Sequence, residues 1–185
     1  PRAAVEALSD ATQRQWGDRL IRSWNEGWWD LQVDVGELIA PVIGASTGEV
    51  IVSDSTSVNL HKLAAAAVAA RAGRSKIVTD DLNFPSDVYI LDAVAAQMTP
   101  PGRLEVVESN GVDGPVDALR AAIDDDTALV SLSLTTFKSG YTYDAAAGTA
   151  AAHEVGALVL WDLSHSAGVI DQGLNAADAD LAVGC

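Results

Sequence analysis

From about residue 50 onward, short β-branched runs alternate with longer windows of helical periodicity, and this alternation most constrains the fold. The runs that we predict to be strands are Val50–Ser53, Lys76–Thr79, Leu104–Val107, Ala128–Leu132, Leu158–Trp161 and Asp180–Val183. The windows that we predict to be helices are Val58–Ala72, Ser86–Ala96, Val116–Ile123 and Ala145–Val155. Such alternation is typical of an α/β fold, a mostly parallel sheet flanked by helices. In such a sheet the ligand binds beyond the carboxyl ends of the strands.

The first 44 residues have a different pattern. Thr12–Gly27 reads as an amphipathic helix that carries tryptophans, and Val35–Ile43 as a second, shorter helix. We therefore expect residues 1–44 to form an N-terminal helical arm packed on the sheet, and residues 45–185 to form the α/β domain.

The composition argues against several classes of partner. Of the 185 residues 49% are hydrophobic and 20% are charged, which provides enough apolar surface for a packed core. The formal net charge of −15 repels phosphate backbones and anionic lipids, so we expect neither a nucleic-acid partner nor a membrane partner. The sequence shows no signal-peptide pattern and no apolar run long enough for a membrane span, so we expect a soluble protein.

A single cysteine, Cys185, is the last residue of the sequence. It permits neither an intramolecular disulfide nor a thiolate zinc site, and we expect no bound metal. This cysteine usage is typical of a reducing compartment, so we expect a cytoplasmic location.

The first of three polar clusters, Asp54–Asn59, lies between a predicted strand and an alanine-rich helix. The hydroxyl groups of Thr56 and Ser57, beside the free N–H groups of a helix start, would form a cradle for a phosphate. The same residues are also typical of an ordinary helix cap, and the cluster alone leaves both interpretations open.

The second cluster is Asn83–Asp87, which follows the next predicted strand. Phe84 precedes Pro85, so its backbone is expected to be extended at a junction between loop and helix. An aromatic ring held there would stack on a planar cofactor, or would serve as a hydrophobic staple of the helix.

The third cluster, Trp161–Gly168, directly follows an apolar strand. An aspartate that closes a buried strand, here Asp162, is unfavourable unless a cation or a donor pairs with it. The protonated nitrogen of a pyridine ring would satisfy Asp162, and His165 would bind the same molecule. A structural Asp–His pair, or a catalytic dyad with an unseen nucleophile, remain alternatives. In this order, however, the three clusters are typical of a pyridoxal 5'-phosphate (PLP) site on a fold-type I scaffold.

Over nearly its whole length the sequence resembles the kynureninase family. The segments that carry the resemblance are Asp54–His61, Phe84–Asp87, Trp161–Gly168 and Arg22–Asn25. The Phe-Pro-Ser-Asp step that begins at Phe84 discriminates best, because related desulfurases and selenocysteine lyases usually place a histidine over the cofactor ring there.

The resemblance implies a role for each matching residue of a PLP-binding large domain. Thr56 and Ser57 would bind the phosphate, and Phe84 would stack on the pyridine ring. Asp162 would pair with the ring nitrogen, with His165 beside it. The other positions that it places at the cofactor are Pro85, Ser86, Asp87 and Ser133, and it places Trp24 near the aromatic end of the substrate.

The resemblance also implies an activity and a missing part. The family's PLP-dependent hydrolysis of L-kynurenine or its 3-hydroxy form yields anthranilate or 3-hydroxyanthranilate and L-alanine, in tryptophan breakdown or in the supply of nicotinamide cofactors. Its members act as homodimers. The family's cofactor lysine follows the strand that here ends with Cys185, and Lys62, Lys76 and Lys138 do not match it. We therefore expect an incomplete large domain that stops before that lysine.

Two alternatives stay open. Another fold-type I PLP enzyme, such as a cysteine desulfurase, a selenocysteine lyase or a class V aminotransferase, would share the three clusters, although the sequence has no catalytic cysteine before Cys185. A non-catalytic fragment is the second alternative, since the lysine is absent.

Overall fold

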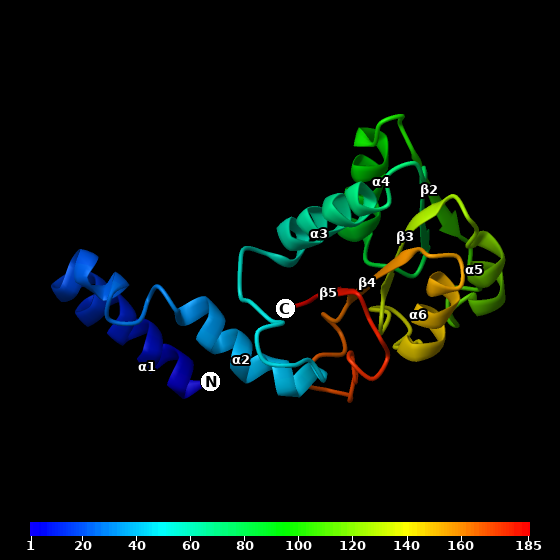
Figure 1. The fold of residues 1–185 in the computed structure, drawn as a ribbon. Helices are drawn as coiled ribbons and strands as arrows, with labels where there is room; N and C mark the ends of the chain where they lie inside the picture. The colour runs from blue at the N-terminus through cyan, green and yellow to red at the C-terminus, as the bar shows by residue number, and fades with distance from the viewer.

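The computed structural model describes residues 1–185 and contains one five-stranded sheet. Its strands are β1 (Lys76–Asp80), β2 (Arg103–Val107), β3 (Thr127–Ser133), β4 (Leu158–Asp162) and β5 (Leu181–Val183). All neighbouring strands are parallel, and their order is β2-β1-β3-β4-β5 (Figure 1). The predicted parallel sheet is confirmed, with five of its strands where the sequence pattern placed them.

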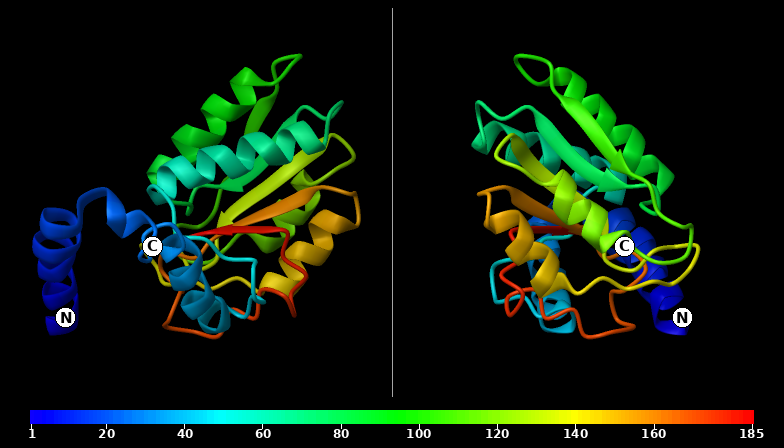
Figure 2. Two further views of the ribbon diagram at one scale, coloured as in Figure 1. Left: turned by 60° about the vertical axis from the view of Figure 1, so that its left-hand side comes forward. Right: turned by 90° about the vertical axis from the view of Figure 1, so that its right-hand side faces the viewer.

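Helices cover both faces of the sheet (Figures 1 and 2). The helices α3 (Thr56–Ala70) and α4 (Pro85–Gln97) pack on one face, and α5 (Val116–Ala122) and α6 (Ala145–His153) pack on the other. The chain passes from β1 through α4 to β2, then through α5 back past β1 to β3. The strand order therefore reverses between β1 and β3, and α/β sheets bind their ligands at such a switch point.

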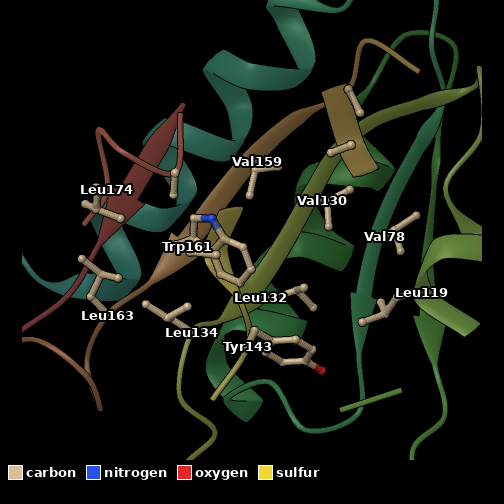
Figure 3. Close-up of a cluster of buried hydrophobic side chains, with 14 of the residues drawn as sticks. Val78, Leu119, Val130, Leu132, Leu134, Tyr143, Val159, Trp161, Leu163 and Leu174 are labelled. Carbon is tan, nitrogen blue, oxygen red and sulfur yellow. The ribbon is translucent and has the colours of Figure 1, made fainter. Parts of the chain in front are cut away.

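The strands build two cores because successive side chains of a strand point to opposite faces. Val130 and Leu132 of β3 pack under α5 and α6 together with Trp161 of β4 (Figure 3). Leu129 of β3 and Leu160 of β4 face α3 and α4 instead. The sheet is thus apolar on both faces over most of its length, as a parallel sheet between two helical layers must be.

The predicted strand Val50–Ser53 is wrong. These residues form an extended connection to α3, and the N–H of Val52 donates to the carbonyl of Gln32 (3.2 Å), which lies on a helix. Ile51 and Val52 are exposed. Their β-branched pattern is typical of a strand, but a strand also needs a neighbouring strand, and none lies beside them.

The N-terminal region differs from the expectation in its helix bounds and its packing. It contains α1 (Arg2–Asp10), a wide helical segment η1 (Ala11–Arg19), a tight turn η2 (Leu20–Trp24) and α2 (Leu31–Ile43), so no single helix spans 12–27. The first 30 residues pack on one another and project from the sheet (Figures 1 and 2). Buried residues near the end of α2, such as Ala40 and Ile43, join it to the body, and the N–H of Val52 donates to the carbonyl of Gln32 near its start. The division at residue 44 stays a prediction.

No helix combines the length and the apolar character that crossing a bilayer requires. No group of three or more His, Cys, Asp or Glu side chains is arranged to hold a metal ion.

Replacing Trp161 with alanine is expected to lower the free energy of unfolding by about 3–5 kcal/mol, because the change leaves a cavity in the core. Trp161 is fully buried, its indole N–H donates to Thr149 (3.3 Å), and a β-carbon at Gly148 would lie 3.0 Å from its ring. Urea denaturation measures the effect. The matched control is Tyr89→Ala, at an exposed aromatic position on α4, which should change this free energy by about 0.5 kcal/mol or less. Equal losses would contradict the core packing described above.

Candidate functional site

Polar side chains gather at the carboxyl edge of the sheet, on the face that α3 and α4 cover. They are Thr79 of β1, Ser131 and Ser133 of β3, and Asp162 of β4, and all are buried. These positions alternate along the strands with core residues that face α5 and α6. Ser133 and Asp162 are direct partners in the register of β3 and β4. One face of the sheet therefore turns polar at the edge where a ligand is expected.

Asn83, in the loop after β1, makes four hydrogen bonds, three of them to these strands, and is itself buried. Its Nδ2 donates to Thr79 Oγ1 (3.0 Å) and to the carbonyl of Ser131 (3.2 Å). Its Oδ1 accepts from the N–H of Phe84 (2.9 Å) and from the hydroxyl of Ser133 (2.7 Å). One side chain thus ties the loop to β1 and β3 and fixes the start of α4.

Two buried carboxyl groups, those of Asp87 and Asp162, lie side by side at this edge. Asp87 belongs to the first turn of α4, and Asp162 ends β4. Burial, together with the negative charge of Asp162, raises the pKa of Asp87 to about 7. The Oδ2 atom of Asp87 is shielded from solvent and has no hydrogen-bond partner. Two carboxylates so placed repel each other unless a proton or a cation lies between them.

Ser164 holds Asp162 from the other side. The N–H of Ser164 (2.9 Å) and its hydroxyl (2.6 Å) both donate to Asp162 Oδ1. Because both bonds use the same carboxylate oxygen, they fix the rotamer of Asp162 and leave Oδ2 available for another donor.

Three aromatic rings meet at the same edge, each from the end of a different strand. Phe84 follows β1, Phe137 follows β3 and His165 follows β4. The centroid of the Phe84 ring lies 5.1 Å from that of Phe137 and 6.1 Å from that of His165. Phe84 has the extended backbone expected before Pro85 (φ −65°, ψ 136°), and its side chain is partly exposed. The cluster offers a ring surface on which a planar molecule would stack.

The first turn of α3 lies at the same edge. α3 ends shortly before β1 begins at the opposite edge, so it runs against the strands and starts at their carboxyl ends. Ser55 caps the helix by accepting from the N–H of Val58 (3.4 Å). Because Ser55 provides the cap, the hydroxyls of Thr56 and Ser57 are not needed for it, and no acidic residue lies in this turn.

The structure therefore brings most of the predicted site residues to one edge. The residues at this edge are Thr56, Ser57, Phe84, Pro85, Ser86, Asp87, Ser133, Asp162 and His165. Pro85 begins α4, and Ser86 Oγ donates to Asp87 Oδ1 (3.3 Å). Trp24 lies elsewhere, on η2 of the projecting arm, where it packs against Trp29 (centroids 5.8 Å apart). Its role at the substrate stays a prediction.

Sequence reasoning assigned no role to Asn83, Ser164 or Phe137. Asn83 adjoins the Phe-Pro-Ser-Asp step, so its position was a signal, but its hydrogen bonds depend on how β1 and β3 pair. Ser164 follows Asp162 by two residues, a spacing that commonly allows a side-chain bond to a backbone N–H. Phe137 carries no local signal, because only the fold brings it to Phe84.

A cavity of about 370 Å³ lies apart from these residues. It is lined by Leu134, by residues 142–146 at the start of α6, and by residues 170–173, 176 and 177. None of the predicted site residues lines it, so the carboxyl edge rather than this cavity is the candidate site.

Comparison with known proteins places the chain among enzymes. The Aminotransferase class-V family model matches residues 31–184. Over its whole length the chain is 44% identical to kynureninase from Pseudomonas fluorescens and 41% identical to kynureninase from Burkholderia pseudomallei (strain 1106a). The chain spans 44% of the length of each of these curated relatives.

Solved structures show the same fold at low sequence identity. A C-DES mutant with glycine covalently linked to its PLP cofactor superposes with a TM-score of 0.82 at 17% identity, over 100% of this chain and 49% of that chain. The apo cysteine desulfurase from Thermococcus onnurineus NA1 gives a TM-score of 0.77 at 19% identity, over 98% of this chain and 46% of that chain.

The family model covers five strands, the carboxyl edge and all but one of the predicted site residues, since only Trp24 precedes residue 31. The fold of the solved structures agrees with it. The chain belongs to the class-V aminotransferase family.

Proposed function

We propose that this chain provides most of the cofactor site of a PLP-dependent enzyme that hydrolyses L-kynurenine, a small-molecule substrate, to anthranilate and L-alanine. The main support for the cofactor is the buried Asp87–Asp162 pair, because two adjacent buried carboxyl groups require a proton or a cationic partner. The identity of 41–44% to kynureninases supports the substrate.

The residues of the carboxyl edge fit PLP. A protonated pyridine nitrogen would give the carboxyl pair its cationic partner. The ring of Phe84 would stack on the pyridine ring, and the first turn of α3, with Thr56 and Ser57, would receive the phosphate through hydroxyl and N–H groups. Ser133 and His165 would contact the same molecule.

The residues of this chain would serve the reaction through charge and position. When bound, PLP supplies an electron sink that stabilises a carbanion next to the substrate's amino group. Asp162 would hold the proton on the pyridine nitrogen, and Ser164 keeps the Asp162 carboxylate in place for that contact. Since the pKa of Asp87 is about 7, its carboxyl group can release its proton near neutral pH when a cation approaches. Burial excludes water and strengthens the attraction between carboxylate and cation.

We also propose that the active protein is a cytoplasmic homodimer that takes part in tryptophan catabolism. The projecting arm supports the dimer, since it exposes Trp16, Ile21, Trp24 and Trp29. The kynureninase relatives support the pathway, and the single cysteine is compatible with the location.

Replacing Asp87 with asparagine is expected to stabilise the cofactor-free protein at pH 8 and to change its stability little at pH 4. The folded protein keeps the Asp87 proton up to about pH 7, whereas the unfolded chain releases it near its usual pKa of 3.8. Wild-type stability therefore falls as the pH rises through this window, and the variant lacks that loss. By pH 8 the gain should reach the order of 1 kcal/mol or more.

Urea denaturation at pH 4, 6 and 8 measures this difference. Asp92→Asn, an exposed position on the same helix, controls for the substitution itself. A variant whose stability tracks that of the wild type at all three pH values would show that Asp87 is not held protonated by its neighbour.

The activity is tested with the full-length protein and PLP. L-kynurenine should yield fluorescent anthranilate, whereas L-cysteine should yield no sulfide. Sulfide release without anthranilate would instead favour a cysteine desulfurase, the second candidate, whose fold is the same.

In the same full-length protein, Asp162→Ala should abolish turnover and weaken PLP binding by tenfold or more, because a preorganised partner of developing charge is worth roughly 2.7–4 kcal/mol. Anthranilate fluorescence measures the first effect and equilibrium dialysis of PLP the second. Near-normal activity in this variant would end the assignment of Asp162 to the pyridine nitrogen.

The arm is expected to contribute to dimerisation. Ile21→Glu places a charge on its exposed apolar surface and should shift the full-length protein toward monomers in sedimentation velocity. Val169→Glu is the matched control, since Val169 is equally exposed and apolar but lies on the body of the protein. If both variants stay dimeric, the arm is not part of the interface.

A further inference from the structure

The hydrogen-bond network of Asn83 determines where its hydrogens lie. The carbonyl of Ser131 can only accept a hydrogen bond, and the N–H of Phe84 can only donate one. These two groups bind opposite atoms of the Asn83 amide, Nδ2 and Oδ1, so the amide has a single possible orientation. The hydrogen bonds of Thr79 are consistent with this orientation, because its hydroxyl donates to the Ser131 carbonyl (2.7 Å) and accepts from Asn83 Nδ2 (3.0 Å).

This orientation also determines the hydroxyl of Ser133. Its oxygen lies 2.7 Å from Asn83 Oδ1, an atom without a hydrogen, so the hydroxyl hydrogen of Ser133 must point to Asn83. A hydroxyl has one hydrogen to donate and two lone pairs. Ser133 therefore presents only lone pairs to any other group at the carboxyl edge, although serine is commonly read as a donor.

We infer that Asn83 is a positioning residue that makes the Ser133 hydroxyl a hydrogen-bond acceptor toward the bound ligand. This inference rests on the proposed function. The ligand atom that meets Ser133 must be an O–H or N–H donor, because a bare phosphate or phenolate oxygen would face a lone pair. The same Asn83 oxygen holds the N–H of Phe84, so one buried amide sets both the polarity of Ser133 and the place of the aromatic ring.

The test is a double-mutant cycle on the full-length protein, with pyridoxine 5'-phosphate as the probe. This compound lacks the aldehyde and cannot bond covalently to a lysine, so its Kd reports non-covalent binding alone. Ser133→Ala and Asn83→Ala should each raise the Kd measured by calorimetry about 10-fold, the order expected for one hydrogen bond. The double variant should bind about as weakly as the weaker single variant, because Asn83 acts through Ser133.

Asn83→Asp is the conservative variant. It keeps an acceptor oxygen for both Ser133 and Phe84, so its Kd should stay within about 3-fold of the wild type even if the protein is less stable. If Asn83→Ala does not fold, the Kd of the Asn83→Asp variant still tests the inference. Thr149→Val controls for the loss of a buried hydroxyl away from the site and should leave the Kd unchanged.

The outcomes distinguish the role inferred for Asn83 from the proposed binding of PLP. Tight binding by the wild type with multiplicative effects in the double variant, or a 10-fold loss in Asn83→Asp, overturns the role of Asn83 and leaves the cofactor in place. A wild-type protein that does not bind the probe overturns the PLP proposal and this inference with it.

Discussion

Two acidic side chains buried against each other set the conditions for the whole carboxyl edge. A pair such as Asp87 and Asp162 is unfavourable in a protein interior, and apolar residues of similar volume would serve stability at least as well. The surrounding structure supports the pair in two ways: Ser164 donates twice to Asp162, and Asp87 sits in the first turn of α4, where the helix dipole favours negative charge. One oxygen of Asp87 still has no partner. The pair therefore requires either a proton or a positively charged partner.

The overall negative charge of the chain opposes the binding of an anionic group at the carboxyl edge. A protein with a formal net charge of −15 repels a phosphorylated molecule at long range. None of the residues that we place at the carboxyl edge is a lysine or an arginine. Lys62, on α3, is paired with Asp54, and Lys138 lies over the ring of Phe137, with its Nζ 5.4 Å from the ring centroid. At the start of α3 the available donors are neutral, namely the N–H groups and hydroxyls of its first turn. Such donors discriminate by geometry more than by charge.

Local patterns predicted the parallel sheet and most of the candidate site, because both depend on features within a few residues of one another. β3 and β4 are buried strands rich in apolar residues, and the rule that ligands bind at strand ends located the clusters around Phe84 and Asp162. The strand at 50–53 was wrong because pairing is a property of two segments, and its β-branched residues have no neighbour. Asn83 was missed as a hub for the same reason: its partners on β3 lie about 50 residues away in the sequence.

The N-terminal arm also shows what a local sequence pattern leaves undetermined. Its amphipathic pattern indicated helices, but a pattern does not say which surface an apolar face will cover, and here most of that face is exposed. Trp24 was placed at the substrate by resemblance alone, and contacts within the chain neither support nor oppose that role.

The alternation of side chains along β3 and β4 has a consequence for how such a protein can change. Along β3, Val130 and Leu132 pack beneath α5 and α6, while Ser131 and Ser133 face the opposite layer. Near the carboxyl end of β3, a substitution at Ser133 therefore alters the polar edge, whereas a substitution at Leu132 alters the packing beneath α5 and α6. Because the two roles lie on opposite sides of the same strand, selection can change ligand recognition and folding stability almost independently.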